Sequence, residues 1–263
     1  MTALRGQILG QDTLVGSWDA LSSLSPGAYL RRARTSLAAV FPAWTPLNNA
    51  VLLDPPTMKA ASAAAAELAE VYANEDVADW ALWLPNPALE FDAPDEVPVV
   101  DGMARDTTTL VMIRDLSDGL PFDGQVRCTT VEAAGQAGDE PVPADRLPIS
   151  DHMSEVLGWS LVDGEYAVAG AWTHQNERDV GIYAVGTAPG WRRRGLAKRL
   201  MLHVLADAYR RGARTASLQS TRMGEPLYSL LQFRPAGRYD EWVPSRQTDQ
   251  PSGDYPCMSG PTD

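Results

Sequence analysis

The stretch Val185–Ala197 constrains the fold of this chain more than any other. Its first residues read as a strand that stops at the turn Pro189-Gly190, and three arginines then lead through Gly195 into an amphipathic helix. The N-terminus of a helix presents unpaired N–H groups and the positive end of the helix dipole. Gly195 lets a ligand approach the backbone closely. The stretch therefore predicts an anion site, and a pyrophosphate is the natural occupant.

The residues that follow predict a regular succession of elements. Residues 196–211 carry apolar side chains at helical spacing, and Gly212 is a suitable helix stop. Residues 215–221 alternate as a strand, and a short helix that starts near Pro226 carries Tyr228. Phe233–Arg238 leads into a last strand near Tyr239–Val243. Upstream, residues 126–131, 166–173 and 180–187 also read as strands.

Arg192-x-x-Gly195-x-Ala197 after a strand resembles the signature of the GNAT superfamily of acyl-CoA-dependent N-acetyltransferases, and the succession of elements around it is similar to the second half of that fold. The resemblance implies an α/β (α+β) fold with a mixed, mostly antiparallel sheet flanked by helices. It also implies acetyl-CoA as cosubstrate and a primary amine, of a small molecule or a peptide, as acceptor.

The resemblance assigns a cofactor role to specific positions. The N–H of Val185 would meet the acetyl carbonyl, and Thr187 would pair with the pantetheine arm. Thr221 stands where relatives often carry an asparagine that holds a pantetheine amide. The pyrophosphate would be bound by the backbone of Arg192, Arg193, Arg194, Gly195, Leu196 and Ala197, with the side chains of Arg193 and Arg194 pointing outward.

Tyr228 falls where many relatives carry the tyrosine that protonates the coenzyme thiolate. Ordinary phenol and thiol pKa values differ by about 1.5 units, so the proton can pass at little cost. The alternative is a tyrosine that only packs its ring.

The general base is harder to assign, because Gly181 stands where some relatives have a glutamate. Asp179 lies two residues earlier on the same strand face, and Glu177 precedes it in a turn. Each also reads as a turn or edge carboxylate, and water or an amine that arrives neutral would make a base unnecessary. His152 is a more distant candidate.

Charge and composition exclude several classes of protein. The 263 residues carry a net charge of −12, and most of it lies in residues 1–123. A nucleic-acid-binding protein would need an extended basic face, whereas an acidic surface suits a cationic amine. No apolar run is long enough to span a membrane, and neither the two cysteines, Cys128 and Cys257, nor the three histidines show metal-ligand spacing. We expect a cytoplasmic protein without a metal, as a monomer or a homodimer.

Two regions are expected, residues 1–123 and 124–263, joined by the turn-rich segment Leu120–Gly124. The first is a smaller α/β half-domain, interpreted either as a degenerate GNAT repeat or as an unrelated cap. It has no phosphate-binding loop, so no cofactor is assigned to it. The elements expected there are helices at 13–24, 26–40 and 58–73 and strands at 49–53, 80–84 and 107–114. In the second region we expect a loop at 135–143, an interrupted helix over 144–159 and a loose tail after Pro244.

Three classes of function are therefore compared. The first is an active acetyl-CoA-dependent N-acetyltransferase. The second is a non-catalytic acyl-CoA-binding or regulatory protein, which the glycine at position 181 favours. The third, a nucleic-acid-binding module that uses Arg192–Arg194, is disfavoured by the net charge.

Overall fold

The computed structural model describes residues 8–53, 57–92, 99–150 and 154–245. His152, Cys257 and the tail beyond Ser245, which the sequence analysis singled out, lie outside the described residues.

Within these residues the strands form one sheet in the order β1-β2-β3-β4-β12-β5-β11-β10-β9-β8-β6, with β7 paired to β9. The strands are β1 (Tyr29–Arg32), β2 (Ser36–Val40), β3 (Asn49–Leu52), β4 (Ala81–Asn86), β5 (Met103–Asp115), β6 (Val126–Thr129), β7 (Val142–Pro143), β8 (Val156–Asp163), β9 (Tyr166–Asn176), β10 (Asp179–Thr187), β11 (Thr215–Ser220) and β12 (Arg234–Pro244). The helices are α1 (Gln11–Ser22), α2 (Met58–Ala73), α3 (Val131–Asp139), α4 (Leu196–Arg210) and α5 (Glu225–Leu230), with single 3-10 turns η1 (Thr45–Leu47), η2 (Ala144–Arg146) and η3 (Pro189–Trp191).

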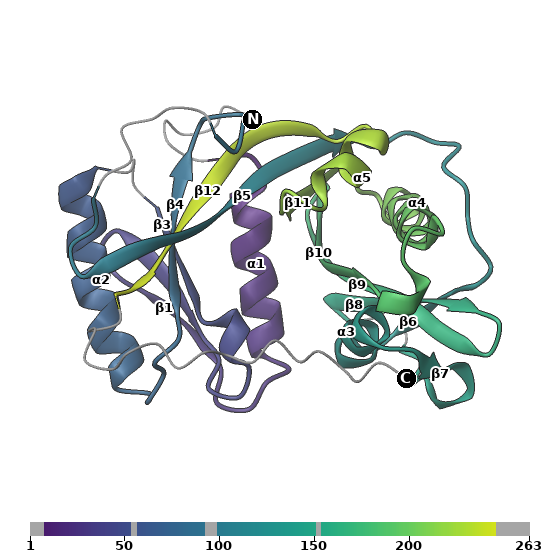
Figure 1. Ribbon diagram of the computed structural model, residues 1–263, viewed down its shortest axis with the longest axis horizontal. Helices are drawn as coiled ribbons and strands as arrows, with labels where there is room; N and C mark the ends of the chain where they lie inside the picture. The colour runs from purple at the N-terminus through teal and green to yellow at the C-terminus, as the bar shows by residue number, and fades with distance from the viewer. Residues whose placement is uncertain (1–7, 54–56, 93–98, 151–153, 246–263) are drawn as a thin grey trace, which may run out of the picture.

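Two long strands join the two halves of the molecule. β5 precedes residue 123 in the chain, yet it lies between β11 and β12, with Met112 opposite Leu218 and Thr109 opposite Tyr239. β12, the last strand, lies between β5 and β4. Figure 1 shows the two strands crossing side by side from one half to the other. The sheet is thus continuous between the two halves. The division of the chain into domains at residues 123 and 124 remains a prediction.

The two halves repeat one topology. In the first half the parallel pair β3 and β4 is connected by α2, and in the second half the parallel pair β10 and β11 is connected by α4. An antiparallel pair of strands precedes each unit in the sheet, β1 and β2 in one half and β8 and β9 in the other. A degenerate repeat would show such a correspondence; whether the first half is a degenerate repeat or an unrelated cap stays a prediction.

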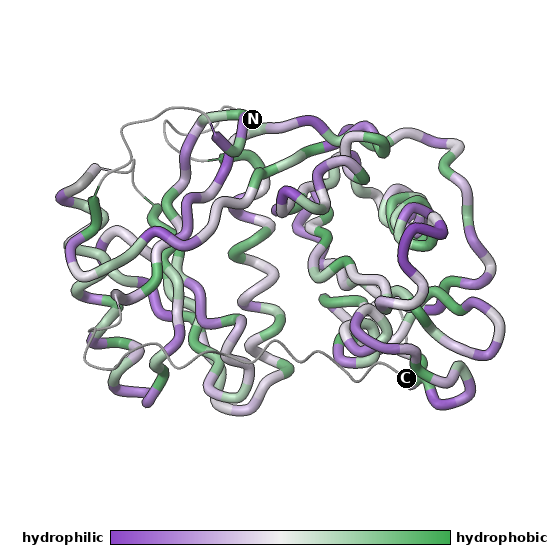
Figure 2. The backbone as a smooth tube through the Cα atoms, viewed as in Figure 1, coloured by the Kyte–Doolittle hydropathy of each residue, from purple (hydrophilic) through white to green (hydrophobic). Residues whose placement is uncertain are grey.

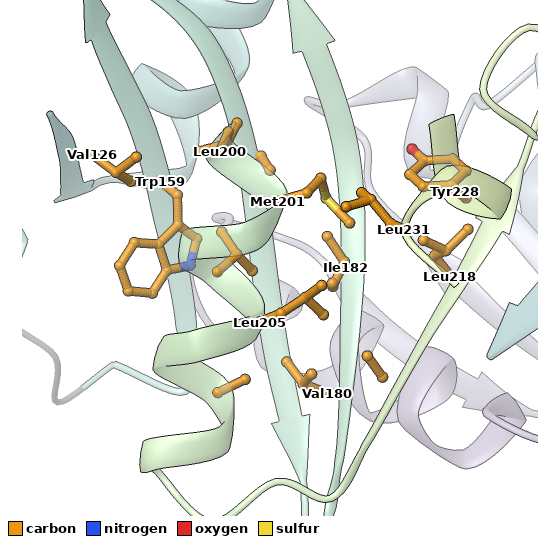
Figure 3. Close-up of a cluster of buried hydrophobic side chains, with 14 of the residues drawn as sticks. Val126, Trp159, Val180, Ile182, Leu200, Met201, Leu205, Leu218, Tyr228 and Leu231 are labelled. Carbon is orange, nitrogen blue, oxygen red and sulfur yellow. The ribbon is translucent and has the colours of Figure 1, made fainter. Parts of the chain in front are cut away.

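Each half has its own buried core, and α1 lies between them (Figure 1). α4 covers one face of the second half with Leu200, Met201 and Leu205, which pack with Val180 and Ile182 of β10 (Figure 3). α2 covers the first half with a stripe of alanines and Leu68. A third cluster forms around α1 and includes Trp18, Trp172 and Tyr239. Burial of each large apolar side chain contributes about 1.5–3 kcal/mol.

The fold class is confirmed, but three expected elements are wrong. Residues 26–40 form β1 and β2 instead of a helix, and all five residues of β2 are buried. The expected loop at 135–143 belongs largely to α3. The expected interrupted helix at 144–159 is only a single turn, η2, followed later by the start of β8.

Candidate active site

The site begins where β10 and β11 separate. The two strands pair only from Asp179 to Gly181 with Thr215 to Ser217. Beyond that point the pairing of β10 with β9 is interrupted by a bulge between Tyr183 and Gly186, where Ala184 adopts a left-handed φ of 49°. A bulge leaves backbone groups unpaired and redirects them. The strand therefore offers backbone amides next to an opening in the sheet.

A cavity of about 740 Å³ occupies this opening. It is lined by eight of the nine predicted cofactor residues and by the predicted acid: Val185, Thr187, Arg192, Arg193, Gly195, Leu196, Ala197, Thr221 and Tyr228. Arg194 and Asp179 are not among the lining residues. The structure thus brings together the predicted loop, strand and tyrosine at one cavity.

The cavity reaches both faces of the sheet. Leu196, Leu227 and Tyr228 belong to the apolar cluster around α4, whereas Trp83 and Tyr183 belong to the cluster around α1. A molecule bound in the cavity can therefore enter from the side of α4 and present its end on the side of α1.

The loop that enters α4 is shaped for an anion. Gly195 is the N-cap residue with φ 75°, and no side chain caps the helix. Arg193 also has a left-handed φ, 60°, and alternating backbone handedness turns successive N–H groups toward one side. Figure 2 shows this hydrophilic segment where the chain leads into α4. The first-turn amides thus lie free at the wall of the cavity.

Two of the three arginine side chains are engaged within the protein. The Arg192 Nε donates a hydrogen bond of 2.9 Å to the Thr187 carbonyl, which fastens the loop to the end of β10. The Arg194 guanidinium lies 4.7 Å from the centre of the Trp191 ring and 3.8 Å from Asp163. The backbone is therefore better placed than these two guanidinium groups to bind an anion.

Tyr228 lies at the edge of the α4 cluster (Figure 3) and is 8% exposed. Its ring contacts Phe233 edge to face, with 6.0 Å between the centroids. Burial raises the pKa of the Tyr228 phenol to about 12. The phenol therefore stays protonated at neutral pH and can donate, but its pKa lies further from that of a thiol than expected from the sequence.

Thr221 borders the cavity, but its hydroxyl is already used locally. Its Oγ1 accepts a hydrogen bond of 3.3 Å from the Gly224 N–H at the start of α5. The hydroxyl proton is still available to an incoming ligand.

Asp179 lies where β10 and β11 are still paired. Its carboxylate accepts hydrogen bonds of 2.7 Å from the hydroxyls of Thr215 and Ser217. These bonds join the two strands at the closed end of the opening, which gives Asp179 a clear structural task. Its catalytic role stays a prediction. Glu177 lies in the turn before β10, with a left-handed φ of 51°.

The structure gives a physical reason for Gly181. A Cβ atom at this position would lie 2.0 Å from the hydroxyl oxygen of Tyr183. The Tyr183 phenol thus fills the space in which a longer side chain at position 181 would begin. A glutamate at this position, as some GNAT relatives have, would require Tyr183 to move.

The sequence analysis missed Glu241, a lining residue that comes from β12. Burial, reinforced by the negative charge of Asp106, raises the pKa of Glu241 to about 7. Trp83 of β4 and Thr109 of β5 line the cavity beside it. These residues are remote from one another in sequence, and only the register of the sheet brings them together.

No helix in the described parts of the chain is long and apolar enough to cross a membrane. The described histidine, cysteine, aspartate and glutamate side chains form no group of three that could hold a metal ion.

Comparisons with known proteins agree with this geometry. Residues 130–229 match the model of the acetyltransferase (GNAT) family. No curated protein sequence matches the chain.

Similar solved structures share the fold at low sequence identity. A GCN5-related N-acetyltransferase from Kribbella flavida is 19% identical, with a TM-score of 0.61 over 90% of this chain and 96% of that one. A conserved protein of unknown function from Staphylococcus epidermidis is 10% identical, with a TM-score of 0.54 over 92% and 99%. A tandem GNAT protein from the clavulanic acid biosynthesis pathway is 14% identical, with a TM-score of 0.53 over 86% of both chains.

Proposed function

We propose that this protein transfers an acetyl group from acetyl-CoA to a primary amine, because residues 130–229 match the model of the acetyltransferase (GNAT) family. One observation carries the proposal: a single cavity joins the uncapped N-terminus of α4, the bulge of β10 and the phenol of Tyr228. These are the groups that bind a pyrophosphate, stabilise a developing oxyanion and protonate a leaving thiolate.

Each part has a defined task in this reaction. The first-turn amides of α4 bind the pyrophosphate, and the uncapped Gly195 leaves them free for it. The N–H of Val185, released from regular pairing by the bulge, donates to the acetyl carbonyl as negative charge develops on its oxygen. Tyr228 donates its phenolic proton to the sulfur as the carbon–sulfur bond breaks.

We further propose that the acceptor is a small-molecule amine and that the protein acts in the cytoplasm without a metal. The net charge of −12 supports a cationic acceptor, since it attracts cations from a distance.

The second candidate is a protein that binds acyl-CoA without catalysis. Gly181, with its space filled by Tyr183, favours this candidate because it removes the base that the resemblance leads one to expect.

Two measurements separate the candidates. Calorimetry with acetyl-CoA measures binding, and a thiol-release assay with acetyl-CoA and a panel of primary amines measures transfer. Binding together with amine-dependent thiol release supports the enzyme. Binding without thiol release for any amine supports the second candidate, and absence of binding contradicts both.

A further inference from the structure

Glu241 is placed in the cavity by an irregularity of β12. Opposite β5, the register of β12 shifts between Asp240 and Trp242, so that Glu241 falls in a bulge. Opposite β4 it is paired directly with Trp83, and directly opposed residues of an antiparallel pair lie on the same face of the sheet. Trp83 packs in the cluster around α1. Glu241 therefore lines the cavity on the face opposite α4.

The carboxylate of Glu241 differs from other sheltered carboxylates of the protein. Asp240 accepts hydrogen bonds from Arg105 and Thr108, and Asp207 is paired with Arg211 at 2.7 Å. Glu241 has no hydrogen bond or ion pair with any residue that the structure describes. A sheltered carboxylate without a partner is costly, and burial disfavours its charged form. Such a group is more often kept for a ligand than for stability.

The charges around Glu241 leave it without a counter-ion. On β5, Asp106 acts on it as a like charge, and Arg105 is engaged by Asp240. β4 contributes the uncharged Trp83. On the walls formed by β10 and β11, the polar side chains that line the cavity include the uncharged Tyr183 and Gln219. The cations that line the cavity, Arg192, Arg193 and Lys198, belong to the loop and first turn of α4. A positive charge is therefore missing on the α1 side.

We propose that Glu241 is the acceptor-site carboxylate of this enzyme, which binds the incoming ammonium group and accepts its proton. This assignment rests on the proposed acetyl transfer. It places the base on β12 and not at position 181, where Tyr183 fills the space, and it makes β4 and β5 of the first half the walls of the acceptor site.

The proton balance of the reaction follows. The ammonium gives one proton to Glu241, which passes it to solvent. The neutral amine then forms a carbon–nitrogen bond with the acetyl carbon, and the carbon–sulfur bond breaks with the electron pair leaving on sulfur. Tyr228 protonates the sulfur and recovers a proton from the nitrogen of the addition product. The net products are the amide, the free thiol and one proton.

The cavity wall also defines the acceptor's chemical class. Beside Glu241 the surface on the α1 side is formed by the rings of Trp83 and Tyr183. Trp83 is held by ring contacts with Trp18 at 5.9 Å and Tyr239 at 5.4 Å. An acceptor that fits is a primary amine with an apolar or aromatic body.

The test compares the full-length parent protein with Glu241→Gln in thiol release from acetyl-CoA, with 2-phenylethylamine, benzylamine and hexylamine as acceptors. For the parent, turnover should fall below a pH of about 7, where Glu241 becomes protonated. Glu241→Gln should lower turnover by about 10²–10⁴-fold and lose this acidic limb. Its affinity for acetyl-CoA, measured by calorimetry, should be unchanged. If instead the pH of this acidic limb changes with the pKa of the amine, the limb reports the titration of the amine and contradicts the role of Glu241.

Two further variants make the test specific. Asp106→Asn removes the like charge that raises the Glu241 pKa, so it should shift the acidic limb to lower pH and leave the plateau unchanged. Glu67→Gln makes the same chemical change on the exposed surface of α2 and should match the parent.

The outcomes are distinct. If Glu241→Gln retains the parental rate and limb, or loses acetyl-CoA affinity in step with its rate, the assignment of Glu241 is wrong while acetyl transfer stands. If the parent binds acetyl-CoA and releases no thiol with any amine, the proposed function is wrong and the assignment is overturned with it.

Discussion

The two halves of this protein use the same connection of strand, helix and parallel strand, yet the N-termini of the two helices differ. At α2 the hydroxyl of Thr57 accepts a hydrogen bond of 3.2 Å from the N–H of Ala60, so the helix is capped by its own side chain. At α4 the cap residue is Gly195, and no side chain occupies the amides. The same fold element is thus closed in one half and open in the other.

The strands that lead into the two helices differ in the same way. β3 is four residues long, and its last three residues are buried. β10 is nine residues long, with a bulge and a left-handed φ at Ala184. The proposed anion site thus coincides with local departures from regular structure, and β3 in the first half has none of them. The first half instead contributes walls to the cavity of the second, through Trp83 and Thr109.

The largest expected effect comes from separating the halves. Residues 124–263 expressed alone lack β5, so β11 and β12 lose the strand that lies between them. β12 also loses its other partner, β4, and such unpaired edges with apolar neighbours favour aggregation. We expect this fragment to be insoluble or unfolded by circular dichroism. A fragment of residues 100–263 retains β5 and should be more soluble. A folded, monomeric 124–263 fragment would show that the halves are independent.

The open helix terminus predicts the next largest effect. In Gly195→Asp the new carboxylate would occupy the amides of α4, as the Thr57 hydroxyl does in α2, and would repel a pyrophosphate. Calorimetry should show acetyl-CoA affinity reduced at least about 100-fold, since a change of 2.7 kcal/mol or more is expected from losing such a site.

Gly212→Asp is the matched control for this variant. Gly212 also has a positive φ, 100°, with nothing near its missing Cβ, and it lies just beyond the other end of α4. The control introduces the same charge and similar backbone strain, so its affinity for acetyl-CoA should stay near the parental value. If Gly195→Asp and the parent bind acetyl-CoA equally well, the pyrophosphate does not bind at this loop.

The segment around the open helix terminus was also the part of the chain that the sequence predicted well. The strand, loop and helix from β10 to α4 carry strong local signals, because a turn, a run of arginines and a glycine mark the boundaries within a few residues. β2 misled the prediction because it is buried on both faces, and a short apolar run has no period that separates strand from helix.

α3 was missed for a different reason. Its two glycines read as loop signals, yet one of them allows the helix to approach the sheet: a Cβ at Gly138 would lie 3.1 Å from the Cα of Gly186 in β10. In the same way a Cβ at Gly170 of β9 would lie 1.7 Å from the Ala134 carbonyl oxygen of α3. Such glycines are explained by packing between distant segments, which no local pattern reveals.

Glu241 was missed because its importance depends on long-range register. In the sequence it is one acidic residue in a strand, and only the position of β12 between β4 and β5 brings it to the cavity. The predicted cofactor residues, by contrast, lie on consecutive elements, and the resemblance of Arg192–Ala197 to the GNAT signature pointed to them.

A smaller effect is expected for Tyr228, the proposed acid on α5. The first half offers no equivalent, since α5 has no counterpart between β4 and β5 among the described residues. Tyr228→Phe keeps the ring that packs on Phe233 and removes the proton donor. Turnover should fall by about 10–10³-fold with little change in acetyl-CoA affinity. Single-turnover kinetics isolate the chemical step, and Tyr209→Phe on α4 is the control. An unchanged chemical step would reduce Tyr228 to a packing residue.

The smallest effect tests the closed helix terminus. In Thr57→Ala the N–H of Ala60 loses its side-chain acceptor, which should cost about 1 kcal/mol of unfolding free energy, as for other N-cap hydroxyls. Thr57→Ser keeps a hydroxyl and should retain most of the parental stability. Thermal unfolding measures both variants.

The binding stoichiometry sharpens the comparison between the halves. Thr57→Ala frees an amide at the start of α2, but β3 has neither the bulge nor the left-handed residue of β10. We therefore expect that the freed amide alone does not create an anion site. Calorimetry should therefore give one acetyl-CoA per chain for the parent and for Thr57→Ala alike. A second molecule bound by the variant would show that Thr57 alone keeps the first half closed, and two bound by the parent would show that the first half is not degenerate.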